Sequence, residues 1–141
     1  MVKKGSAVWT GGFKDGSGSI STETGALNEA PYGTQARFEE GRGTNPEELI
    51  AAAHAACFSM ALSLMLGEAD LTPEEIRTTA AVTLEKVGDG YAITASHLTV
   101  GVRIPGADPA KFDEIANKAK AGCPVSKLLN AKISMDASLQ A

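Results

Sequence analysis

The sequence predicts a mixed α+β fold, and three segments carry that prediction. Residues 49–66 form an uncharged, alanine-rich stretch of 18 residues that is typical of a buried helix. Two strand-like segments, 76–87 and 91–104, meet at a glycine-rich turn. A chain of 141 residues is the usual size of one compact domain. We therefore expect a single domain over residues 1–141, with one core.

The chain is predicted to open with strands. Residues 5–10 and 17–22 alternate small or polar side chains with bulkier ones, which is the pattern of a strand. The Gly- and Ser-rich segment between them favours a hairpin turn, and a third strand is expected before Phe38. These elements would form a small antiparallel sheet ahead of the central helix.

The start of the central helix is the strongest local signal. Thr44 or Asn45 can cap the helix, and Pro46 suits its first turn. Glu47 would complete a Thr-x-x-Glu capping box with Thr44. The helix is expected to end at Gly67.

The uncharged stretch 49–66 is long enough to cross a membrane. Six of its residues are alanines, however, and acidic residues flank it where a cytoplasmic membrane edge favours Lys or Arg. We therefore predict a buried helix rather than a membrane span. Because it is apolar all round, such a helix should be covered on every side.

The second half of the chain is predicted to be strands followed by helices and a closing strand. Asp108 should cap a helix because Pro109 follows it at the first helical position. The expected elements are a short turn at 73–75, strands at 76–87 and 91–104, helices at 109–121 and 123–130, and a strand at 131–139. The face of the first of these helices that should be buried carries Phe112, Ile115, Ala116 and Ala119.

Composition excludes some classes of partner. The formal net charge is -4, so the chain offers no basic field to a nucleic-acid backbone or an anionic membrane. The first residues lack the apolar core of a secretory signal, which predicts a cytoplasmic protein. In that reducing compartment a permanent disulfide is not expected. The two cysteines are then inert thiols, metal ligands or redox groups.

The residues alone do not decide which cysteine reacts. Cys57 lies inside the buried helix, where a cysteine is more often an inert core residue. Cys123 comes just before Pro124 at a helix start, where backbone N–H groups favour a thiolate. Spacing alone therefore favours Cys123 as the nucleophile.

Three other side chains could assist a thiol. His54 precedes Cys57 by one helical turn, although an isolated histidine on an apolar helix more often packs against a neighbour. Arg37 could stabilise a thiolate if an acid such as Glu47 fixed its guanidinium. A zinc site from the two histidines and two cysteines lacks any CxxC or HxxxH spacing, so no metal or cofactor is expected.

Four motifs, in order and spacing, resemble the OsmC/Ohr family and its OsmC branch most closely. They cover essentially the whole chain, and their combination is more specific than any one of them. The motifs are Pro31-Tyr32-Gly33 with Arg37-Phe38, Gly43-Thr44-Asn45-Pro46-Glu47-Glu48-Leu49, Ala52-Ala53-His54-Ala55-Ala56-Cys57-Phe58-Ser59-Met60, and Lys118-Ala119-Lys120-Ala121-Gly122-Cys123-Pro124-Val125-Ser126.

The resemblance implies both an architecture and a site. It implies an intertwined homodimer, in which antiparallel sheets wrap around a long buried central helix and the active sites lie at the subunit interface. It reverses the order of the cysteines, so that Cys57 is peroxidatic and Cys123 resolves it. Residues matching Arg37 and Glu47 form a salt-bridged pair that holds the thiolate.

The expected activity is reduction of organic hydroperoxides, and more weakly of hydrogen peroxide, in oxidative or osmotic stress defence. It would run through a Cys57 sulfenic acid and a Cys57–Cys123 disulfide. The family implies lipoyl groups on proteins as the dithiol reductant. Phe38, Phe58 and Met60 are predicted to line an apolar substrate pocket.

Two alternative functions stay open at this point. One is a thiol–disulfide oxidoreductase, which the lack of a CxxC motif disfavours. The other is a non-enzymatic dimeric binding protein with structural cysteines.

Overall fold

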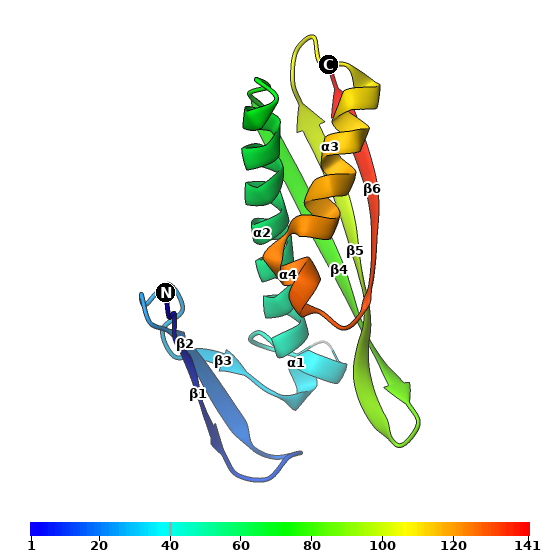
Figure 1. The fold of residues 1–141 in the computed structure, drawn as a ribbon. Helices are drawn as coiled ribbons and strands as arrows, with labels where there is room; N and C mark the ends of the chain where they lie inside the picture. Colours follow the sequence, from blue (N-terminus) through cyan, green and yellow to red (C-terminus); the bar gives the residue numbers. More distant parts are fainter. Residues whose placement is uncertain (40) are drawn as a thin grey trace. The chain divides into compact units, whose positions relative to one another are not determined.

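The first 49 residues form a three-stranded antiparallel sheet and one short helix (Figure 1). The computed structural model describes residues 1–39 and 41–141, and these divide into two units, 1–49 and 50–141. The elements of the first unit are β1 (Gly5–Thr10), β2 (Ser17–Thr22), β3 (Ala30–Tyr32) and α1 (Thr34–Phe38). The predicted bounds of the first two strands and the presence of a third are confirmed, whereas α1 was not predicted.

Gly18, in the middle strand β2, makes room for a pair of aromatic rings. In the strand register it lies opposite Trp9 of β1 and Tyr32 of β3. The ring centroids of Trp9 and Tyr32 are 5.6 Å apart, with a tilt of 56°. A Cβ at Gly18 would collide with both rings. Glycine is therefore required here for the two side chains to approach each other across the strand.

Asn45 caps the central helix α2 (Pro46–Glu68). Its Oδ1 accepts a hydrogen bond from the backbone N–H of Glu48 at 2.7 Å. Thr44 instead donates its hydroxyl to the Glu48 carboxylate, also at 2.7 Å. The predicted Thr44–Glu47 capping box is thus wrong, because the Asn45 amide takes the capping position and leaves Glu47 available for another partner.

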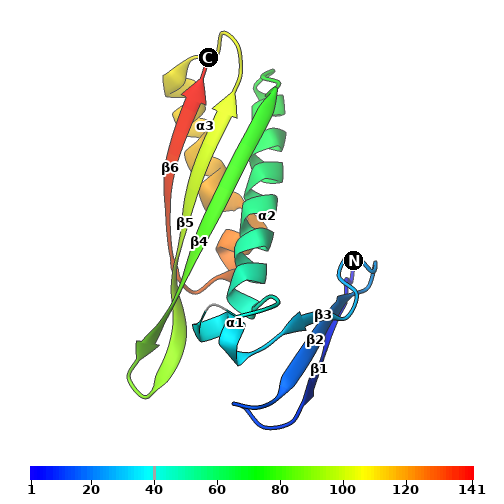
Figure 2. The same ribbon diagram turned by 180° about the vertical axis from the view of Figure 1, so that it is seen from behind.

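The second unit is a three-stranded sheet with helices on one face (Figures 1 and 2). Its elements are α2 from Ile50 onward, β4 (Glu75–Val87), β5 (Gly90–Arg103), α3 (Pro109–Gly122), α4 (Pro124–Leu128) and β6 (Lys132–Gln140). β4 pairs antiparallel with β5, and β6 joins β5 in parallel, so this sheet is mixed rather than antiparallel. The mixed α+β class is confirmed.

The core of the second unit lies between the sheet and the two long helices. Alternate residues of β5 point toward the helices and are buried, as the period of two in a strand requires. Asp108 caps α3 by accepting from the backbone N–H of Ala110, as predicted. The largest buried apolar side chains are Phe58, Leu62, Leu66, Leu98, Val100, Val102, Ile104, Phe112 and Ile115, and the predicted buried face of α3 is confirmed.

Only one side of α2 is covered within the chain. Phe58, Leu62 and Leu66 are fully buried, while Met60 and Leu64 are 74% and 65% exposed. The sequence predicted a helix whose need for cover could exceed what one short chain supplies, and the exposed side chains of this single chain agree with that expectation. By length and hydropathy α2 also meets the criterion for a membrane span, as core helices of soluble proteins do.

The end of α2 lies one residue beyond the predicted position. The helix continues through Gly67 to Glu68, and Asp70 takes the left-handed backbone conformation with φ 59°. The N–H of Leu71 then bonds to the carbonyl of Leu66 at 2.9 Å. Asp tolerates this conformation better than most side chains, so the stop signal was one that a search for glycine misses.

Candidate active site

The two cysteines lie together in the second unit as free thiols. Cys57 is on α2 and half-buried, and Cys123 is the N-cap of α4 and fully buried. The Cys57 thiol lies next to the Cys123 thiol and the backbone N–H of Val125, close enough for both to act on its pKa. Sequence spacing could not show this contact, because 66 residues separate the two thiols along the chain.

The surroundings within the second unit do not favour a thiolate. Burial raises the pKa of the Cys57 thiol. The Val125 backbone N–H acts in the opposite direction, and the neighbouring Cys123 thiol raises the pKa further. Because only the thiolate is a strong nucleophile, a peroxidatic Cys57 needs a positive charge that these groups do not supply.

His54 lies one turn before Cys57 on α2 and is fully buried. Its Nδ1 is 2.6 Å from the Ser96 Oγ of β5, and its Nε2 is 2.8 Å from the Ser126 Oγ of α4. Burial lowers the pKa of His54, so its imidazole is neutral at neutral pH. These two serine contacts agree with the expectation that an isolated histidine on an apolar helix packs against its neighbours rather than assisting a thiol.

Arg37 and Glu47 form the predicted ion pair in the first unit. Both the Nε and a terminal nitrogen of Arg37 contact the same Glu47 oxygen, Oε1, at 2.9 and 2.7 Å. The Arg37 side chain is 35% exposed and that of Glu47 10%. The Arg37 guanidinium also lies over the Phe38 ring, 5.6 Å from its centroid. The guanidinium is therefore fixed on two sides while part of it stays accessible.

The second oxygen of Glu47 has no assigned role in this pair. Oε2 is buried and has no hydrogen-bond partner among the described residues. A buried carboxylate oxygen without a partner carries a desolvation cost of about 1–3 kcal/mol or more. The pair thus orients Arg37 without using all of the hydrogen-bonding capacity of Glu47.

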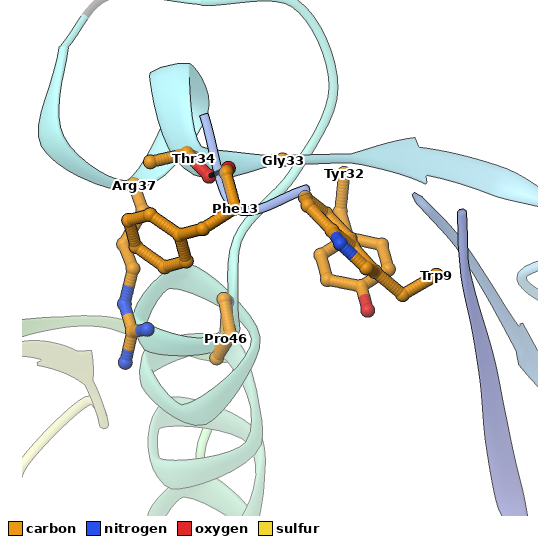
Figure 3. A pocket seen from close by; sticks show the side chains of 7 residues that line it. All are labelled: Trp9, Phe13, Tyr32, Gly33, Thr34, Arg37 and Pro46. Carbon is orange, nitrogen blue, oxygen red and sulfur yellow. Dashed lines mark hydrogen bonds between the residues drawn. The ribbon is translucent and has the colours of Figure 1, made fainter. Parts of the chain in front are cut away.

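An apolar pocket of about 280 Å³ adjoins Arg37 in the first unit (Figure 3). Phe13 and Arg37 both line the pocket, and so do the Trp9 and Tyr32 rings, which are tilted against each other. Its lining consists of Trp9, Phe13, Tyr32, Gly33, Thr34, Arg37 and Pro46. An apolar cavity with a guanidinium at its edge is suited to a ligand with a hydrocarbon group and a polar end.

The predicted pocket residues occupy other positions. Phe58 is fully buried in the core, Met60 is exposed on α2, and Phe38 contacts the Arg37 guanidinium. The prediction that these three line the pocket described here is wrong, because it relied on closeness in sequence to the motifs. The aromatic residues that do line it come from β1, β3 and the turn between β1 and β2, and no local sequence pattern indicates that these segments converge.

Comparison with known proteins places the chain among redox proteins. The family model described as OsmC-like protein matches residues 39–138. The chain is 60% identical to Peroxiredoxin OsmC of Escherichia coli strain K12 over 98% of the chain and 96% of the relative. It is 30% identical to the organic hydroperoxide resistance protein OhrB of Bacillus subtilis over 87% of the chain and 89% of the relative. The crystal structure of B. subtilis OhrB superposes with a TM-score of 0.68 at 27% identity, covering 97% of this chain and 98% of that one.

Proposed function

Because this chain belongs to the OsmC family, we propose that it reduces organic hydroperoxides to alcohols, with Cys57 attacking the peroxide and Cys123 resolving it. The chain is a cysteine-based peroxidase with an antioxidant role in the stress response, which sets aside the non-enzymatic alternative. One observation carries the assignment of roles. The two thiols lie next to each other, and Cys57 is the more exposed of the two.

The proposed reaction has two steps. The Cys57 thiolate attacks the O–O bond of the hydroperoxide, which leaves a sulfenic acid on Cys57 and releases an alkoxide that takes up a proton to become the alcohol. The Cys123 thiol then attacks the sulfenic sulfur, forms a disulfide with Cys57 and releases water. A dithiol must reduce that disulfide before the next turnover. We propose that protein-bound lipoyl groups supply it.

Arg37 is the group that we assign to thiolate stabilisation. Burial and Cys123 both raise the pKa of Cys57 within its own unit, so the thiolate needs an added positive charge. Arg37 is held by Glu47 and remains partly accessible. Partial accessibility is needed if the guanidinium is to bind both a thiolate and a peroxide. A carboxylate that fixes a guanidinium from one side leaves its other N–H groups free to bind.

The pocket beside Arg37 is the site that we assign to the organic group of the substrate. Its aromatic lining favours hydroperoxides with a hydrocarbon tail or ring over hydrogen peroxide, which buries no apolar surface. We therefore propose that the enzyme prefers organic hydroperoxides to hydrogen peroxide. Equal turnover of hydrogen peroxide and a fatty-acid hydroperoxide would contradict it.

We also propose a cytoplasmic, intertwined homodimer in which each chain acts as one domain. The uncovered side of α2 supports association, because it carries exposed apolar side chains and no charge between Leu49 and Gly67. Its exposed positions include Ala53, Ala56, Met60 and Leu64. A copy of the chain could cover this stripe. Size-exclusion chromatography with light scattering should give a dimer that Met60→Glu dissociates, and a monomeric wild type would contradict the proposal.

Single-turnover oxidation of the reduced protein tests the assigned roles. The protein is mixed with an equimolar organic hydroperoxide, quenched at set times and measured by intact mass. Wild type should form a Cys57–Cys123 disulfide, Cys123→Ser should stop at the sulfenic acid, and Cys57→Ser should leave the peroxide unreacted. If Cys57→Ser consumes peroxide as fast as wild type, the assignment of Cys57 is wrong.

A thiol–disulfide exchange assay completes the test. Insulin reduction by the reduced protein should be slow compared with its reaction with organic hydroperoxide. The reverse order of rates would favour the oxidoreductase alternative.

A further inference from the structure

A chain of three buried polar side chains crosses the core next to the thiols. Ser96 of β5, His54 of α2 and Ser126 of α4 are linked through the two ring nitrogens of His54 at 2.6 and 2.8 Å. His54 and Ser96 are fully buried, and Ser126 is 9% exposed. A neutral imidazole has one N–H donor and one acceptor nitrogen, and a serine hydroxyl can serve either. Both nitrogens are thus satisfied in a core where an unpaired polar group would be costly.

The short helix α4 depends on contacts with the rest of the second unit for its position. It has five residues, a length at which helices do not hold themselves together in water. Ser126 is its only buried residue, and Leu128 at its end is 77% exposed. Two side chains thus anchor α4: the buried Ser126, whose partner is His54, and the partly buried Val125, which packs against the core.

Two contacts between α2 and α4 lie side by side. Cys57 lies next to the Cys123 thiol and the Val125 N–H. His54, one turn earlier on α2, contacts the hydroxyl of Ser126, which directly follows Val125. Ser96 fixes the other side of the imidazole from the sheet. The imidazole therefore ties the segment that carries Cys123 both to the helix that carries Cys57 and to β5.

We propose that His54 is a positioning residue for disulfide formation, holding α4 so that Cys123 stays within reach of the Cys57 sulfenic acid. The proposal rests on the assigned roles of the two cysteines. His54 takes no part in the attack on the peroxide. Loss of its serine contacts should slow only the second step, in which the Cys123 sulfur displaces water from the oxidised Cys57.

Rapid-quench single turnover with an organic hydroperoxide separates the two steps. The rate of sulfenic acid formation and the rate of disulfide formation are measured for wild type, His54→Leu, His54→Gln and Ser126→Ala. We expect disulfide formation to slow about tenfold or more in His54→Leu and Ser126→Ala, with sulfenic acid formation within about twofold of wild type. His54→Gln, whose amide can both donate and accept, should recover much of the rate.

Two control variants distinguish positioning from general loss of stability. Leu66→Ala removes a buried side chain from the same helix without touching the polar chain. His97→Gln alters the other histidine, which contacts Ser134 and Asp136 at 2.6 and 3.0 Å. Because His97 follows Ser96 in β5, it points to the opposite face of the sheet. Neither control should slow disulfide formation, although Leu66→Ala should lower Tm.

Several outcomes would overturn the proposal. Unchanged disulfide formation in Ser126→Ala would do so, even if His54→Leu failed to fold. Equal slowing of both steps in the His54 and Ser126 variants would show that His54 only stabilises the fold. Similar slowing of disulfide formation by Leu66→Ala would lead to the same conclusion. A wild type that forms no Cys57–Cys123 disulfide would refute the cysteine roles themselves, and this result is visible before any His54 variant is made.

Discussion

The two units of the molecule contribute opposite kinds of chemistry. The second unit holds two thiols in an apolar core, where burial raises the pKa of Cys57. The first unit holds a partly exposed ion pair and an apolar pocket. The core alone would thus keep Cys57 in the protonated, unreactive form, and the charge that could reverse this belongs to the other unit. In the proposed mechanism, the nucleophile belongs to the second unit, and the groups assigned to activate it and to bind the substrate belong to the first.

Removing the positive charge of Arg37 should have the largest effect, because it should raise the pKa of the Cys57 thiol. An adjacent opposite charge typically shifts a pKa by 1–3 units, so Arg37→Gln should slow attack on an organic hydroperoxide about 10- to 1,000-fold at neutral pH. The pH dependence of iodoacetamide labelling should move to higher pH in this variant. Arg42→Gln, in the same unit and exposed, is the control. Unchanged labelling would mean that the two units do not cooperate in this way.

Loosening the ion pair should have a smaller effect than removing it. Glu47→Gln keeps the Arg37 charge but weakens the contacts at 2.7 and 2.9 Å that orient it. We expect attack to slow about 10- to 100-fold, because small displacements of a positioning group are costly. Glu48→Gln is the matched control, since Glu48 bonds to Thr44 rather than to Arg37. Steady-state kcat/KM for an organic hydroperoxide measures the difference, and equal losses in the two variants would refute the orienting role.

The pocket of the first unit should affect selectivity more than chemistry. Trp9→Ala removes one ring of the Trp9–Tyr32 pair and part of the pocket lining. The ratio of kcat/KM for an aromatic hydroperoxide to that for hydrogen peroxide should fall about tenfold. The rate with hydrogen peroxide should stay close to that of wild type. A loss shared equally by the two substrates would assign Trp9 to folding of the sheet instead.

The smallest expected effect concerns stability of the second unit in mild acid. Burial lowers the pKa of His54 below its ordinary value of about 6.5. The unfolded chain therefore binds a proton that the folded chain excludes, and stability falls as the pH drops below about 6.5. The Tm of His54→Gln should therefore fall less on acidification than the Tm of wild type. The Tm of Trp9→Ala, a change in the first unit, should fall as much as that of wild type. Parallel Tm profiles for wild type and His54→Gln would contradict the assignment.

The helices and strands could be predicted from the sequence better than the tertiary contacts between them. Alternation in residues 5–10 and 17–22 and the cap at Asp108 are local signals, and both are confirmed. Asn45 rather than Thr44 caps α2, and Glu47 forms a tertiary contact with Arg37 instead of completing a capping box. Local propensity cannot reveal it.

The candidate site shows the same division. The motifs pointed to Arg37, Glu47, Cys57 and Cys123, and the two expected neighbour pairs are present. Their chemical roles remain predictions. The serine partners of His54 and the aromatic pocket were missed, because Ser96 and Trp9 approach these sites only through strand pairing and packing. The sequence indicated that one chain could leave α2 partly uncovered, but not which residues would stay exposed, because hydropathy does not tell burial in one chain from burial in an assembly.

The parallel pairing of β6 has a consequence for the order in which the protein forms. A parallel strand can join its neighbour only after the intervening crossover has been made, and here that crossover consists of α3 and α4. Such long-range closure is slow compared with hairpin formation between β4 and β5. During synthesis Cys57 emerges well before Cys123. Under the proposed roles, a newly made chain carries its attacking thiol before the resolving partner is in place, and a sulfenic acid formed at that stage would stay open to irreversible oxidation.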